Sequence, residues 1–227
     1  LVLTVVLGVV IERVAYKPLR SSPRMSVMIS AIGVSYLLQN CALYFTGGLP
    51  RSYPVIPFLT KSVKIWGATT KMVTVVTPIL TILLVIVLVL LIKYTKIGMA
   101  MRAVSKDFET SQLMGIKINS VISFTFVIGC FLAAVGSMLY FSNYTSVIPT
   151  SGAMPGLKAF VAAVFGGIGS IPGAVIGAFI IGICENIIRS FGQDWTVFSD
   201  AFTFVLLIVV LLVKPTGIFG EKATDKV

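Results

Sequence analysis

The run of residues 166–173, GGIGSIPG, contains the residue types that most directly suggest chemistry. Glycine loops that hold phosphate groups end in Gly-Lys-Ser or Gly-Lys-Thr, and this run has no such ending. Ser170 would need a general base beside it to act as a nucleophile, and the chain contains no histidine. We therefore expect neither an ATP site nor an intramembrane serine protease at this run.

A tight turn on the cytoplasmic side, between two short helices, is the better interpretation of this run. Non-helical backbone is tolerated within a membrane protein where protein rather than lipid surrounds it. The GxxxG pair that follows lets two helix backbones approach closely, within this chain or against a partner. The residues assigned to this turn and packing surface are Gly166, Gly167, Gly169, Ser170, Pro172, Gly173 and Gly177.

The absence of histidine also excludes histidine-containing metal sites and Ser-His or Cys-His nucleophile pairs. Cys41, Cys130 and Cys184 lie far apart in apolar segments and lack CxxC spacing, so we expect them to pack as small apolar side chains. We predict no catalytic residue, no metal site and no cofactor bound by this chain itself.

Polar side chains within the apolar stretches are few, and three of them are candidates for a translocation path. Ser35 and Gln39 are four residues apart on one helix face, where they either line a path or bond to a neighbouring helix. Glu185 has the helical ion-pair spacing to Arg189, which favours a structural pair near the outer membrane interface over a substrate contact.

These residues belong to a membrane protein, because 57% of the 227 residues are hydrophobic, 11% are charged and the mean hydropathy is +1.02. The chain begins with the uncharged stretch 1–11, which we interpret as the remainder of a truncated membrane helix. Six further spans are predicted at Met25–Phe45, Met72–Ile92, Asn119–Phe141, Ala153–Phe165, Gly173–Ser190 and Ser199–Val213.

The basic residues predict the orientation of these spans. Twelve Lys and Arg lie in segments 12–24 and 93–118 and in the tail from residue 214, which the positive-inside rule places in the cytoplasm. The opposing connection 46–71 carries four basic residues and no acidic one, which departs from that rule. Because the net charge of +10 arises mostly between spans, we expect no nucleic-acid surface.

The cytoplasmic segment 93–118 contains the signals of a short helix. Asp107 is placed to cap it, Glu109 lies in its first turn and Gly115 follows its end. Isolated helices shorter than about 12 residues are marginal in water, so this helix needs a surface to lie on. A partner protein and the neighbouring loops of the same chain are equally good candidates for that surface.

Five segments together resemble the permease subunit of bacterial branched-chain amino acid ABC importers, the H-type subunit of the leucine/isoleucine/valine system. They are VIERVAYKPLR (10–20), SAIGVSYLLQN (30–40), GMAMRAVSKDFETSQLMGI (98–116), KAFVAAVFGGIGSIPGAVIGAFIIGICEN (158–186) and KPTGIFG (214–220). The resemblance covers essentially the whole chain in order. It implies an all-α, polytopic helical bundle in the bacterial inner membrane, in contact with membrane lipid.

The resemblance also implies the partners of such a subunit. They are a second homologous permease, two cytoplasmic ATPase subunits that bind the ATP, and an extracytoplasmic amino acid binding protein. The segment coupled to an ATPase would include Arg102, Asp107, Glu109, Leu113, Met114, Gly115 and Ile116.

We therefore expect a single transmembrane permease domain over residues 1–227 that forms half of a path for branched-chain or other hydrophobic amino acids. It would not itself be an enzyme. Three alternatives remain: an ion-coupled secondary transporter with Glu185 as its carboxylate, a urea or amide ABC permease, and a structural subunit without a path.

Overall fold

The computed structural model divides the chain into two compact units, Leu1–Pro149 and Thr150–Val227, which we describe separately. The prediction of a single domain is not tested by this division and stays a prediction. The residues that the structure describes are 1–21, 24–54, 61–65, 68–167, 169–214 and 216–220.

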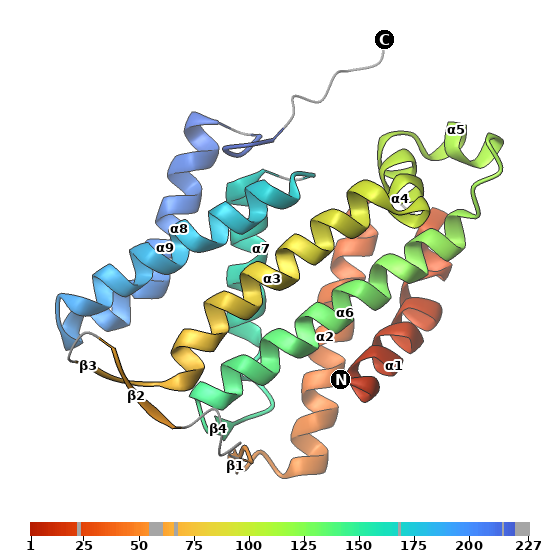
Figure 1. Ribbon diagram of the computed structural model, residues 1–227. Helices are drawn as coiled ribbons and strands as arrows, with labels where there is room; N and C mark the ends of the chain where they lie inside the picture. The colour runs from red at the N-terminus through yellow and green to blue at the C-terminus, as the bar shows by residue number, and fades with distance from the viewer. Residues whose placement is uncertain (22–23, 55–60, 66–67, 168, 215, 221–227) are drawn as a thin grey trace. The chain divides into compact units, whose positions relative to one another are not determined.

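The first unit is built mainly of helices (Figure 1). The helical elements are α1 (Val2–Ile11), the π turn η1 (Glu12–Tyr16), the 3-10 turn η2 (Pro18–Ser21), α2 (Arg24–Thr46), α3 (Met72–Tyr94), α4 (Lys96–Lys106), α5 (Phe108–Leu113) and α6 (Ile118–Asn143). Helices α3 and α6 pack together and run in opposite directions. The helix α4, which we did not predict, turns back from the end of α3 and leads into α5.

Two short antiparallel pairs of strands lie in the connections of this unit. Strands β2 (Ser62–Ile65) and β3 (Ala68–Lys71) form a hairpin within the basic connection after α2. Strand β1 (Arg51–Ser52) pairs with β4 (Ser146–Val147), which follows α6. These pairs are minor additions to a helical chain.

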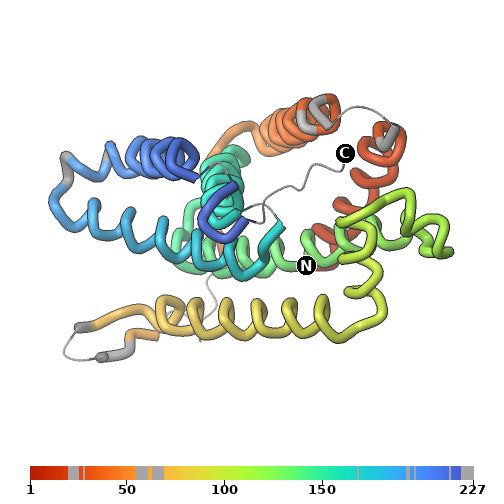
Figure 2. Tube along the Cα trace, turned by 90° about the horizontal axis from the view of Figure 1, so that it is seen from above, coloured from red at the N-terminus to blue at the C-terminus, as the bar shows by residue number. Residues whose placement is uncertain are grey.

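The second unit packs α7 (Ala153–Gly166), α8 (Ile171–Ser190) and α9 (Gln193–Val213) around a small apolar core. Helices α8 and α9 run side by side, as Figures 1 and 2 both show. The fully buried core side chains are Val161, Ala162, Phe165 and Ile181, with Phe204, Leu207 and Ile218 partly buried against them. Val161, Ala162 and Phe165 form one apolar stripe on α7, and this stripe faces the two neighbouring helices.

All six predicted spans are helices, with ends that differ from the predictions by at most six residues. Among the described residues, α3, α6 and α8 are long and apolar enough to cross a membrane, while α7 and the part Phe198–Val213 of α9 are apolar but shorter. Helix α2 is as long as α3 but carries Ser35, Gln39 and Asn40.

Large aliphatic side chains on α3 are exposed rather than buried, which is the pattern of a helix that meets lipid or a partner helix. Those that are about half exposed or more are Ile79, Ile82, Leu83, Ile86, Val87 and Leu90. A water-soluble protein rarely exposes such a continuous apolar stripe.

Candidate functional site

The short helix α5 begins as the sequence predicts. The Asp107 carboxylate accepts a hydrogen bond from the Thr110 backbone N–H at 3.2 Å through Oδ1, and its Oδ2 accepts from the Thr110 hydroxyl at 2.8 Å. Glu109 lies in the first turn, where the helix dipole favours a negative charge. The predicted cap at Asp107 is thus confirmed.

The end of α5 is a Schellman motif centred on Gly115. The Ile116 N–H donates to the Ser111 carbonyl at 3.2 Å, and the Gly115 N–H donates to the Gln112 carbonyl at 3.0 Å. Gly115 has a φ of 80°, a left-handed conformation that costs a residue with a side chain about 1–2 kcal/mol. The predicted glycine stop is confirmed, and capping at both ends compensates for a helix of six residues.

Helix α4 positions α5 by a sharp turn from α3. Thr95 caps α4 by accepting from the Gly98 N–H at 3.0 Å. A Cβ atom on Gly98 would lie 2.4 Å from the carbonyl oxygens of Leu91 and Ile92, so this turn requires glycine. The guanidinium of Arg102, a residue assigned to the coupling segment, donates to the Lys93 carbonyl at 3.2 Å and so holds α4 against the end of α3.

The surface that this arrangement displays is apolar. Leu113 is 86% exposed and Met114 is 79% exposed, whereas Ser111 of the same helix is buried. Ile116 is half-buried and Phe108 is half exposed. Two exposed apolar side chains thus lie at the end of a helix that is capped at both ends.

The glycine-rich run forms the predicted turn between α7 and α8. Gly167 ends α7 with a φ of 112°, and Gly169 also has a positive φ of 96°. Ser170 caps α8, because its hydroxyl oxygen accepts from the Gly173 N–H at 3.2 Å. Pro172 lies in the first turn of α8, where its missing N–H costs nothing.

The GxxxG pair packs within this chain, which resolves an alternative that the sequence leaves open. A Cβ atom on Gly177 would lie 2.7 Å from the Ala162 carbonyl oxygen, and one on Gly173 would lie 2.5 Å from the Gly166 carbonyl oxygen. The backbones of α7 and α8 therefore touch along this stripe.

The segment after α9 closes over the same turn. The Ile218 N–H donates to the Phe165 carbonyl at 3.0 Å, and the Phe219 N–H donates to the Gly166 carbonyl at 2.9 Å. A Cβ atom on Gly217 would lie 2.6 Å from the Gly167 Cα atom. These contacts supply partners for carbonyl groups at the end of α7 and explain why this segment is rich in glycine.

The three candidate path residues lie in different units and are not described as one site. Gln39 donates to the Ser35 hydroxyl at 3.5 Å on α2, so the predicted shared face is confirmed. Glu185 forms the predicted ion pair with Arg189. Lys158 also approaches Glu185 at 2.6 Å and Asp200 at 2.6 Å, so one ammonium group bridges two carboxylates from α8 and α9.

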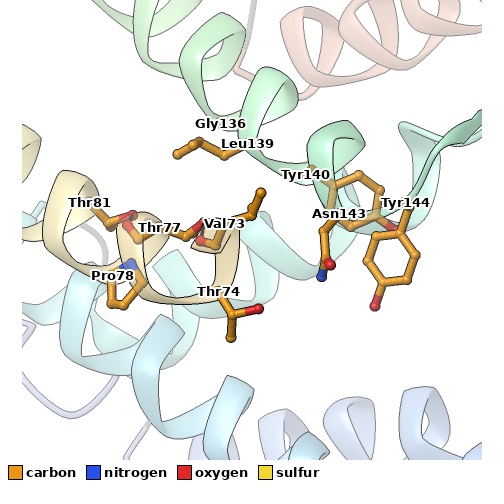
Figure 3. Close-up of a pocket in the computed structure, with 10 residues that line it drawn as sticks. All are labelled: Val73, Thr74, Thr77, Pro78, Thr81, Gly136, Leu139, Tyr140, Asn143 and Tyr144. Carbon is orange, nitrogen blue, oxygen red and sulfur yellow. Dashed lines mark hydrogen bonds between the residues drawn. The ribbon is translucent and has the colours of Figure 1, made fainter. Parts of the chain in front are cut away.

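A cleft of about 360 Å³ between α3 and α6 is a feature that the sequence analysis missed (Figure 3). Its ten lining residues are Val73, Thr74, Thr77, Pro78 and Thr81 of α3, and Gly136, Leu139, Tyr140, Asn143 and Tyr144 at the end of α6. Figure 3 shows the two helices as opposite walls. The signal for it was three threonines at helical spacing beside a proline in an otherwise aliphatic span.

Glu12 is a buried acidic residue that the sequence analysis also missed. Its side chain is 1% exposed, in the π turn after α1, and its Oε2 accepts a hydrogen bond from the Ser123 hydroxyl at 3.0 Å. The rings of Tyr16 and Phe126 lie 5.1 Å apart at an interplanar angle of 47°. One turn earlier Gly8 lies directly against Cys130, which packs as expected, whereas Cys41 on α2 is exposed.

Residues 1–211 match the family model described as the permease component of the branched-chain amino acid transport system. The chain belongs to this permease family. The permease is accordingly a membrane transport subunit, as the resemblance implied. No solved structure matches the permease.

Curated relatives agree with this assignment. The high-affinity branched-chain amino acid transport system permease protein LivH of Salmonella typhimurium is 40% identical over 96% of the permease and 71% of its own length. The corresponding protein BraD of Pseudomonas aeruginosa is 39% identical over 100% of the permease and 74% of its own length. The ribose import permease protein RbsC of Haemophilus influenzae is 32% identical over 53% of the permease and 39% of its own length.

Proposed function

We propose that this permease forms half of the translocation path of an ATP-binding-cassette importer. A binding protein outside the cytoplasm would deliver branched-chain or other hydrophobic amino acids to it, and two separate cytoplasmic ATPases would drive it. A second, homologous permease would complete the path. The names of relatives at 39–40% identity over nearly the whole chain support this substrate class.

The observation that best supports the proposed contact with an ATPase is the exposed apolar end of α5. Leu113 and Met114 are displayed to solvent at 86% and 79%, on a helix that two caps hold in shape. Covering exposed apolar side chains with a partner protein is favourable, because it removes apolar surface from water. A partner that binds at α5 would then move together with the helix. Through α4 and Arg102, such a displacement reaches α3 directly.

The proposed orientation places α4, α5 and the tail after α9 in the cytoplasm. Within the first unit, α5 and the β2–β3 hairpin lie at opposite ends of the antiparallel helices α3 and α6, as alternating sides of a membrane require (Figure 1). The twelve basic residues of segments 12–24, 93–118 and the tail support the cytoplasmic side for α5. A cytoplasmic ATPase would then reach it.

The ion-coupled alternative is less well supported. A coupling ion needs a carboxylate that is available to it, and Glu185 already pairs with Lys158 and Arg189. The named relatives likewise give no support to a urea or amide substrate.

Replacing Leu113 with Asp tests the proposed docking of α5. A charge there should reduce co-purification of the ATPase and substrate-stimulated ATP hydrolysis roughly tenfold, because it would have to be desolvated in an apolar contact. Gly115→Val should act in the same direction by straining the helix stop. Leu49→Asp is the matched control, since Leu49 is also exposed, at 69%, in the connection after α2, which the proposal places outside the cytoplasm.

The extracted yield of folded permease separates docking from folding. We expect both Asp variants to be extracted as well as the unmodified chain. Full ATPase binding by Leu113→Asp, or an equal loss in Leu49→Asp, would remove α5 as the coupling element.

A further inference from the structure

We propose that the cleft between α3 and α6 binds the free amino acid in transit, with its α-amino and carboxylate groups between Thr74 and Asn143 and its aliphatic side chain against Leu139. This inference rests on the proposed function and adds a substrate station within this chain. It differs from the path residues expected from the sequence, none of which lines the cleft.

The size of the cleft suits one small molecule. Its volume of about 360 Å³ is near the lower limit of the roughly 300–1,000 Å³ that small-molecule sites have. Every one of its lining residues belongs to the first unit, on two helices that pack together. Gly136 and Gly129 on α6 both leave open space where a Cβ atom would lie, and Gly136 opens into the cleft.

The α3 wall offers hydrogen-bond acceptors. The hydroxyls of Thr77 and Thr81 donate to the carbonyls of Val73 and Thr77 at 2.7 and 2.8 Å, so their oxygen lone pairs remain available as acceptors. Pro78 has no N–H, and the Thr74 carbonyl therefore lacks the donor that an α-helix normally places four residues later. An ammonium group carries three donors and satisfies such acceptors.

The α6 wall offers donors near the same level. Asn143 supplies an amide N–H₂, and Tyr140 and Tyr144 supply phenol hydroxyls, all at one end of the cleft in Figure 3. These groups can donate to a carboxylate. Pro78 and Leu139 add aliphatic surface to the walls.

The charge of the site agrees with a zwitterion. None of the ten described residues that line the cleft is Lys, Arg, Asp or Glu. A molecule whose ammonium and carboxylate groups are attached to the same carbon atom needs no single counter-ion, whereas a cationic or anionic amino acid would leave one charge without a partner. Weak binding of this kind permits release, and a separate binding protein supplies the affinity.

The position of the cleft agrees with delivery from outside. It lies in the first half of α3 and the last turns of α6, near the chain positions of strands β3 and β4. In the orientation proposed above, these ends face the extracytoplasmic side. A substrate released by the binding protein would enter the membrane there.

A steric variant tests this assignment directly. Gly136→Leu should fill the aliphatic part of the cleft without a backbone clash, and Gly129→Leu is the matched control two turns earlier on the same helix. In proteoliposomes that contain the complete importer, enclosed ATP and external binding protein, the initial rate of radiolabelled leucine uptake should fall roughly tenfold or more in Gly136→Leu. It should change less than about twofold in Gly129→Leu.

A second pair tests the acceptors with little change in volume. Thr77→Val removes one lining hydroxyl, and Thr125→Val removes a hydroxyl that makes the same kind of bond, to the Val121 carbonyl at 2.8 Å, outside the cleft. We expect roughly threefold or greater loss of leucine uptake in Thr77→Val relative to Thr125→Val, with unchanged amounts of the second permease and the ATPases in the complex.

The outcomes distinguish this inference from the function on which it rests. ATP-driven uptake by the unmodified importer with equal rates in Gly136→Leu and Gly129→Leu would overturn the inference and leave the function intact. Loss of the second permease from the Gly136→Leu complex would assign the cleft to a subunit interface and also overturn it. Failure of the unmodified importer to take up leucine would remove the proposed function and the inference together.

Discussion

Lys158 is the residue on which the charges of the second unit converge. Its ammonium group lies 2.6 Å from both Glu185 and Asp200, and Arg189 pairs with the same Glu185 oxygen, Oε1, that Lys158 contacts. The side chains of Lys158 and Glu185 are 20% and 13% exposed, whereas those of Asp200 and Arg189 are 38% and 39% exposed, so the centre of the cluster is the part withdrawn from solvent. A single cation thereby joins three helices that are otherwise held by apolar contacts.

Lys158→Met is expected to destabilise the permease measurably. Two carboxylates would lose their shared cation, at a cost between the roughly 1 kcal/mol of an exposed pair and the roughly 3–5 kcal/mol of a broken buried pair. The midpoint of thermal unfolding of the detergent-extracted chain should fall by several degrees. Arg189→Met is the control, because Arg189 is 39% exposed and should cost less. Equal losses in the two variants would contradict the central place of Lys158.

The spacing of charges on one helix was sufficient to predict the Glu185–Arg189 pair, because it is a local property of the sequence. Lys158 and Asp200 could not be added in this way, since they join Glu185 only after α7, α8 and α9 have packed. The same reason applies to Glu12, whose partner Ser123 is 111 residues away in the chain.

At the scale of elements, glycine determines which helix faces meet. Gly177 lies against the Ala162 carbonyl, whereas Gly182 on the same helix leaves open space where its Cβ atom would lie. Replacing glycine with leucine improves helix propensity equally at both positions. A difference between the two variants therefore reports on backbone packing alone.

Gly177→Leu should lower the stability of the second unit, and Gly182→Leu should not. The added side chain at Gly177 must separate α7 from α8, at a cost of about 1–3 kcal/mol or more. Folded yield after detergent extraction and the midpoint of thermal unfolding are the measurements. Comparable yields of the two variants would show that this stripe does not hold the helices together.

The spans could be predicted from the sequence because hydropathy and charge act over about 20 residues at a time. The caps of α5 could be predicted because Asp107 and Gly115 act on adjacent backbone groups. Helix α4 was missed, since it is an amphipathic helix of 11 residues, too short to be recognised as a membrane span, and its turn depends on the contact of Gly98 with α3. The α3–α6 cleft was missed because it forms only where the two helices pack together, so the sequence of neither helix shows it.

At the scale of the whole molecule, the permease family and the exposed apolar end of α5 support the proposal that separate ATPase subunits drive transport. We propose that α5 is the element through which closure of the ATPases moves the permease. The resemblance of five segments was enough to predict the family, which the match over residues 1–211 confirms. The substrate remains the part of the proposal that depends on the binding protein.

Uptake of radiolabelled leucine into proteoliposomes tests this account most directly. The vesicles would contain the permease with its second permease and ATPases, with binding protein outside and either enclosed ATP or an imposed proton or sodium gradient. The account predicts uptake that requires enclosed ATP and the ATPases and is unaffected by either gradient. Gradient-driven uptake by the permease without ATP or ATPases would contradict it.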